Sequence, residues 1–278
     1  MQNGLNPPWL LCYRCNMSCV MYSHPPVVER ALAFGCTLTE EAFQTKLASW
    51  GERVKQAFPS SKIQRQWQIQ IAEKNGMPFL SSEGQKLTTK YQFFQHSGED
   101  KKQGIQIWQD KISFNLFSSA ENPRSFVELR EIANTWAPQW ASHFGVSSVH
   151  GIRLEYVNLL SPKTVPGFCS DGRIRLGEIL TAFKVPGPYK DLTSPFDFQF
   201  NMVANQPDFP MAIHASLKGA QHDGGTLRLL FRASTENSER SISLDAAKKE
   251  MDTAHSSIVS VFDAFFSEEA KNSFGQIK

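Results

Sequence analysis

Four strand-like segments in the second half of the sequence carry the side chains best suited to chemistry. Within each segment apolar residues alternate with charged or amide residues, so the polar side chains should share one face of a β-sheet. Glu155 and His214 are the pair in this set that could exchange protons with a substrate. The predicted binding set on this face is Arg153, Glu155, Gln199, His214, Lys218, Arg228 and Arg232.

This polar face has four interpretations. It could be a solvated surface with cross-strand ion pairs, each worth tenths of a kcal/mol, or a surface that receives a partner. A hydrolase or transferase would place Glu155, His214 and Arg228 around a pocket between two halves of the molecule, with a perturbed carboxylate pKa. Nucleic-acid binding is the fourth interpretation. Strand register decides among them, and sequence does not determine it.

A second polar face is predicted in the first half of the chain, and it is rich in amides. Amides donate and accept hydrogen bonds without carrying charge. Single-stranded nucleic acid would also need aromatic rings for stacking, and Trp108 and Phe117 are the expected outward rings. The amide set is Gln66, Gln68, Gln70, Gln92, Gln106 and Asn115.

Three of the five cysteines lie close together near the N-terminus. Cys12, Cys15 and Cys19 have a spacing that could supply three thiolates to zinc or to a cluster. No fourth ligand with matching spacing follows them, so we predict no metal site. Free thiols without a secretion signal favour a reducing cytoplasm.

Composition excludes several classes of protein. The chain has 29 basic and 27 acidic residues, a net charge of +2, which gives no bulk field for nucleic acid or an anionic membrane. No apolar run approaches the roughly 18 residues that span a bilayer. Neither a P-loop nor a dinucleotide-binding fingerprint occurs, so no cofactor is predicted.

Helices must cover the strands, and the clearest helical pattern in the sequence is in the last long segment, where it runs from Leu244 to Phe265. Residues of this segment recur at three- and four-residue spacing and form one apolar stripe on a helix of about seven turns. Such a stripe requires an apolar surface, which the preceding strands supply. The charged residues of this segment, Glu250 among them, mostly fall off the stripe. The stripe is Leu244, Ala247, Met251, Ala254, Ile258, Phe262 and Phe265.

The order of elements repeats along the chain, although the residues do not. Residues 24–148 read as strand, helix, three or four strands and helix, and residues 149–278 as strand, short helix, three strands and helix. Short connections favour antiparallel meanders. We therefore predict an α+β fold: two similar halves of antiparallel sheet, packed as one body, with helices on one face and a long C-terminal helix. Residues 1–23 are expected to form a poorly ordered extension.

Three segments resemble a sporadically distributed family of uncharacterised bacterial proteins. They are Pro25–Glu29, Gly151–Asn158, and the C-terminal stretch from Ala254–Ile258 through Phe265 to Phe274–Gly275. The resemblance frames residues 25–275 and includes no chemical motif. It implies a bacterial, cytosolic setting, with sporadic occurrence pointing to mobile or defence-linked genes, and it implies no reaction.

The sequence favours a non-catalytic binding or adaptor protein over an enzyme. Polar side chains are abundant, but no nucleophile, base and oxyanion donor converge. The expected partner is another protein or a second copy of the chain, acting in the cytoplasm and without a membrane. Hydrolysis or group transfer by Glu155 and His214 is the alternative, and nucleic-acid binding is the weaker one.

Overall fold

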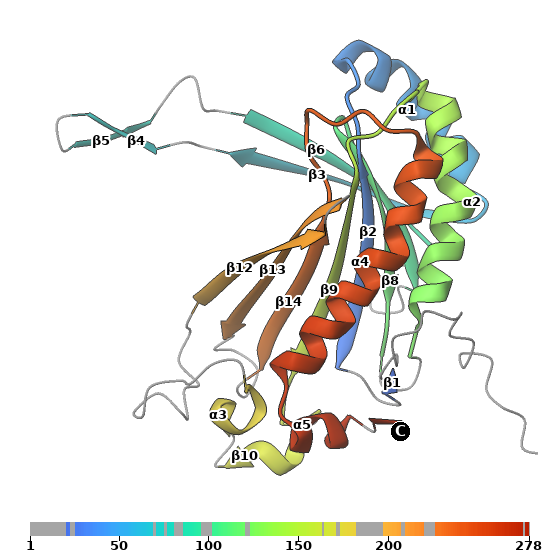
Figure 1. The fold of residues 1–278 in the computed structure, drawn as a ribbon. Coiled ribbons are helices and arrows are strands. Elements are labelled where there is room, and N and C mark those ends of the chain that lie inside the picture. The colour runs from blue at the N-terminus through green and yellow to red at the C-terminus, as the bar shows by residue number, and fades with distance from the viewer. Residues whose placement is uncertain are drawn as a thin grey trace, which may run out of the picture.

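The protein is described by a computed structural model. It describes residues 21–22, 26–68, 71–74, 77–80, 86–95, 102–119, 123–162, 164–170, 173–181, 197–206, 209–219, 226–274 and 276–277. Helices and strands follow the labels of Figure 1.

A nine-stranded sheet forms the body, and every neighbouring pair of its described strands is antiparallel. The strand order is β12-β13-β14-β9-β2-β8-β7-β6-β3. The bounds are β2 (Val27–Gly35), β3 (Ser60–Gln68), β6 (Lys86–Phe94), β7 (Gln103–Trp108), β8 (Lys111–Phe117), β9 (Ile152–Leu160), β12 (Asp197–Gln206), β13 (Phe209–Gly219) and β14 (Leu227–Ser234).

The two sets of strands meet at the β2–β9 pair. From this seam the order β2-β8-β7-β6 is repeated on the other side as β9-β14-β13-β12. One continuous sheet therefore contains both sets. The division at residue 148 stays a prediction.

Helices α1 (Glu40–Val54), α2 (Phe126–Phe144) and α4 (Leu244–Phe265) lie on one side of the sheet (Figure 1). Helix α2 packs on β2 and β8, and α4 packs on β9, β13 and β14. The predicted α+β fold with antiparallel strands, helices on one face and a long C-terminal helix is confirmed. Its other face carries none of these helices.

Local sequence signals explain where the long helices begin and end. Ser125 and Glu128 form a capping box at the start of α2, and Gly145 ends that helix with φ 75°. Ser243 caps the start of α4 by accepting from the Ala246 N–H. These caps fix the helices so that their apolar stripes meet the sheet.

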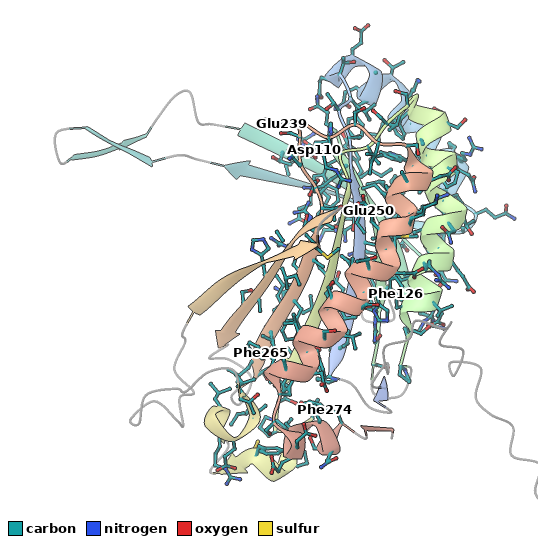
Figure 2. The ribbon with its side chains drawn as sticks, in the orientation of Figure 1. Asp110, Phe126, Glu239, Glu250, Phe265 and Phe274 are labelled. Atoms are coloured by element: carbon teal, nitrogen blue, oxygen red, sulfur yellow. The ribbon has the colours of Figure 1, made fainter. Side chains whose placement is uncertain are left out.

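The stripe of α4 is buried as predicted. Ala247, Met251, Ala254, Ile258 and Phe262 are all buried. Phe265, near the lower end of α4 in Figure 2, packs edge-on against Phe231 of β14 with ring centroids 5.3 Å apart.

The remaining elements are short. They are β1 (Met21–Tyr22), β4 (Ile71–Lys74), β5 (Met77–Leu80), β10 (Cys169–Ser170), β11 (Arg173–Ile174) and β15 (Gln276–Ile277), the 3₁₀ turn η4 (Pro166–Phe168), α3 (Leu176–Ile179) and α5 (Glu268–Ser273). Of the predicted N-terminal extension only Met21 and Tyr22 are described, and they pair with β15.

Candidate functional site

The sheet face opposite the helices contains a hollow of about 420 Å³ that is open to solvent. Six neighbouring strands line it, from β14 to β6. The lining residues are Glu29, Ala31, Ala33, Lys90, Gln92, Phe94, Gln106, Trp108, Lys111, Ser113, Asn115, Phe117, Arg153, Glu155, Val157 and Arg228.

The alternation of residues along β2 explains why the sheet is hollowed at its centre. Leu32 and Phe34 of this strand are fully buried under the helices. Ala31 and Ala33 point to the opposite face and line the hollow. Because an alanine side chain is one methyl group, the larger side chains of neighbouring strands rise above this central strip.

A group of two lysines and a tryptophan lies at the end of the hollow that β6, β7 and β8 form. Trp108 of β7 is paired in register with Lys111 of β8. The Lys111 and Lys90 ammonium nitrogens lie 4.9 Å and 5.5 Å from the centroid of the Trp108 ring, a cation–π arrangement. Among the described residues neither lysine has an ion-pair partner.

The environment of Lys90 disfavours its positive charge. Partial burial lowers the pKa of Lys90, and the charges of Lys111 and Lys62 lower it further, whereas Glu29 opposes them. A nearby anion would stabilise the ammonium form. This end of the hollow therefore attracts negative charge.

Two buried amides form the floor beside this group. Gln92 of β6 and Gln106 of β7 face each other in register, and each is only 9% exposed. In the part of the chain that the structure describes, neither side chain has a hydrogen-bond partner. Their amide atoms are not among the buried atoms without a partner, so they reach the solvent in the hollow and are accessible to a ligand.

The next polar side chains on the floor are, by contrast, bonded to one another. The Ser113 hydroxyl donates to Asn115 Oδ1 at 3.2 Å, and Asn115 Nδ2 donates to Glu29 Oε1 at 2.8 Å. These bonds fix the Glu29 carboxylate in place. The floor thus has a part near Glu29 whose side chains are hydrogen-bonded to one another, and a part near Lys90 whose amides are accessible to solvent.

The second-half residues that the sequence singled out lie toward the opposite end. Arg232 Nε donates to Glu155 Oε1 at 2.7 Å across β14 and β9. Arg153 pairs with Glu236 at 3.3 Å, and Arg228 is exposed. Two of the three arginines are therefore already neutralised by ion pairs within the chain.

Glu155 and His214 are not adjacent. In register His214 faces Arg232, and Arg232 faces Glu155, so the arginine lies between them. Two strand spacings separate their backbones, roughly 9–10 Å. Burial lowers the pKa of His214, and the charge of Arg232 lowers it further. Gln199 lies on β12 and Lys218 on β13, but their side chains are outside the description.

Metal and thiol chemistry find no further support in the described residues. Cys12, Cys15 and Cys19 lie outside them. Within the described ranges no group of three or more His, Cys, Asp and Glu side chains is arranged to hold a metal ion. Burial raises the pKa of the Cys36 thiol to about 12, and burial also raises the pKa of Cys169, so both thiols are protonated near neutral pH.

Sequence reasoning identified part of this site. It named Glu155, Arg153 and Arg228 as binding residues, and all three line the hollow. Three of the six predicted first-half amides, Gln92, Gln106 and Asn115, line it as well. Gln70 and the side chains of Gln66 and Gln68 lie outside the described residues. It missed Lys90 and Lys111. The alternation of Ala31 and Ala33 with Leu32 and Phe34 is a sequence signal that could have indicated the hollow.

No helix in the described ranges combines the length and the hydropathy that a membrane span requires. Comparisons of the chain with protein-family models, with curated proteins and with solved structures found no match.

Proposed function

We propose that this chain is a non-catalytic binding protein that holds a protein partner on the polar face of its sheet. The observation that carries the proposal is the pair of amides at the floor of the hollow, Gln92 and Gln106. They are buried, they have no partner among the described residues, and they face a space of about 420 Å³. Their amide atoms reach the solvent in this space, so a partner could replace that water with hydrogen bonds of its own.

Catalysis by Glu155 and His214 is the weaker proposal. A general base must lie within hydrogen-bond reach of the proton it removes and of the groups that orient it. Glu155 is bonded to Arg232, and His214 is two strands away. Nucleic-acid binding is weaker still, because Trp108 is flanked by two lysines and Phe94 packs on Phe117 at 6.3 Å, which leaves few ring faces for stacking.

The setting we propose is the bacterial cytoplasm, in a role as an adaptor of a mobile or defence-linked system. The resemblance of three segments to a sporadically distributed bacterial family supports this setting. So do Cys36 and Cys169, which are free thiols.

Affinity capture from a lysate of the cells that encode the chain tests the proposal. Arg228→Glu reverses an exposed charge on the hollow, and Lys249→Glu makes the same change on the exposed side of α4. We expect at least one protein to be retained by the wild type and by Lys249→Glu and lost by Arg228→Glu. Light scattering of the purified chain reveals whether the retained protein is a second copy.

Equal retention of every captured protein by Arg228→Glu would contradict the proposal. The binding surface would then be the helical side or an edge strand.

A further inference from the structure

We infer that the partner presents an extended acidic segment, which lies across the strands of the hollow and places a carboxylate beside Lys90 and Lys111. This inference rests on the proposed function, and it specifies the chemistry of the partner at that same site.

The shape of the hollow favours an extended chain over a small molecule. Its lining comes from six adjacent strands, β14, β9, β2, β8, β7 and β6. Strands lie about 4.8 Å apart, so the hollow spans roughly 24 Å across the sheet. An extended polypeptide covers that distance with about seven residues. A volume of about 420 Å³ spread over this length is a narrow groove.

The distribution of charge favours acidic residues in that segment. Arg153 and Arg232 are neutralised by Glu236 and Glu155. The charges on Lys90 and Lys111 outnumber the single nearby carboxylate of Glu29, which is bonded to Asn115. One added carboxylate would balance this end of the groove. Arg228 lines the opposite end and suits a second carboxylate.

The uncharged part of the floor favours a polypeptide as the carrier of those carboxylates. Gln92 and Gln106 each offer two N–H donors and one acceptor oxygen. An extended main chain presents both C=O acceptors and N–H donors, so it matches an amide floor. Polyphosphate chains offer acceptors alone, and Glu29 and Glu155 in the lining repel them.

Fluorescence anisotropy with a fluorescein-labelled heptaglutamate peptide tests the inference. The variant is Lys90→Gln/Lys111→Gln, and the matched control is Lys55→Gln/Lys249→Gln, which removes two lysines that are exposed on helix-side elements. We expect the first variant to weaken binding at least about tenfold and the control to leave it unchanged. A labelled heptaglutamine peptide should not bind.

Charge reversal separates loss of binding from loss of folding. Lys111→Glu should lose the heptaglutamate peptide and gain affinity for a heptalysine peptide, an outcome that an unfolded chain would not give. Unchanged binding of heptaglutamate to Lys90→Gln/Lys111→Gln would overturn the inference. Tighter binding of free glutarate than of heptaglutamate, or of a thymidine decanucleotide that depends on the same lysines, would also overturn it.

The lysate capture distinguishes failure of this inference from failure of the proposed function. A partner that is lost on Arg228→Glu but retained on Lys90→Gln/Lys111→Gln would leave the proposed function intact and contradict the acidic segment. Retention on both variants would contradict the proposed function itself.

Discussion

The same strands form both faces of the sheet, but the polar side chains on the two faces lie in different environments. On the helix side, Arg30 of β2 donates to the Ser118 hydroxyl at 3.1 Å and lies 5.2 Å from the centre of the Tyr156 ring. The Tyr156 hydroxyl and His255 Nδ1 are hydrogen-bonded at 2.7 Å. Phe126, labelled in Figure 2 at the start of α2, stacks on His255 with ring centroids 4.2 Å apart.

Polar atoms that have no partner within the chain are buried on the helix side of the sheet, whereas those of the hollow reach solvent. Arg30 Nε and the indole nitrogens of Trp50 and Trp140 are buried and have no partner. These atoms are covered by helices, so they cost stability without giving access to a ligand. The amide atoms of Gln92 and Gln106 are not among the buried atoms without a partner and lie in an open hollow, where they are accessible to a ligand. The helix side is therefore closed to ligands, and the opposite face is where the proposed partner would bind.

The largest expected effect is on the free energy of unfolding, and it comes from a substitution on the helix side of the sheet. Phe262→Ala should lower the free energy of unfolding by roughly 3–5 kcal/mol, because it empties a buried site between Phe231, Phe266 and Phe274. Urea denaturation measures the change. Arg228→Ala on the opposite face and Lys249→Ala on the exposed side of α4 should each change it by less than about 0.5 kcal/mol. Equal losses in the three variants would show that the stripe of α4 is misplaced.

The second prediction concerns pH and the buried histidine. Burial lowers the pKa of His255 from 6.5 to about 3, and the charges of Arg30 and Arg130 lower it further. Between these two values the unfolded chain binds a proton that the folded chain does not, so stability falls as the pH falls. The groups around the ring are Tyr156 of β9, Arg30 of β2, and Phe126 and Arg130 of α2.

The expected loss through His255 is roughly 1.5 kcal/mol between pH 6.5 and pH 5. The measurement is urea unfolding at both pH values for the wild type and for His255→Gln, which lacks the titrating group. The difference between the two proteins isolates His255 from the carboxylates. Parallel pH profiles would mean that folding does not lower the pKa of this histidine.

Periodicity was sufficient to predict the helices and their buried faces, because it depends on residues that are close in sequence. The buried stripe of α1 recurs at helical spacing and consists of Phe43, Leu47, Trp50 and Val54. A proline inside a helix removes one backbone hydrogen bond, yet α2 continues through Pro138. Pro138 and Asn134, whose carbonyl loses its intrahelical partner, are both exposed, so water can take the place of the missing donor.

Partners that are distant in sequence could not be predicted. Glu250 falls off the apolar stripe of α4, yet it is buried, accepts from the Thr235 hydroxyl and pairs with Arg240 at 2.6 Å. His255 of α4 is hydrogen-bonded to the Tyr156 hydroxyl of β9, a residue 99 positions away in the sequence. Each of these contacts depends on how an element packs on a remote strand.

The same limit applies to the candidate site. Lys90, Trp108 and Lys111 come from three strands, and only the register of β6, β7 and β8 brings them together. The sequence showed that the second-half polar residues alternate along their strands. It did not show that Arg232 would separate Glu155 from His214.

The smallest expected effect on stability is at the floor of the hollow. Gln106→Leu should leave the free energy of unfolding within about 0.5 kcal/mol of the wild type, because the amide that it removes has no described partner to lose. Asn115→Leu, one strand away, should cost about 1–3 kcal/mol, because Glu29 loses the donor that holds it at 2.8 Å. Both values come from urea unfolding, and heptaglutamate binding is measured on the same samples. Gln106→Leu should weaken that binding while it preserves stability, which is the behaviour of a residue that serves a ligand. A loss of stability as large as that of Asn115→Leu would instead assign Gln106 to the internal structure of the sheet.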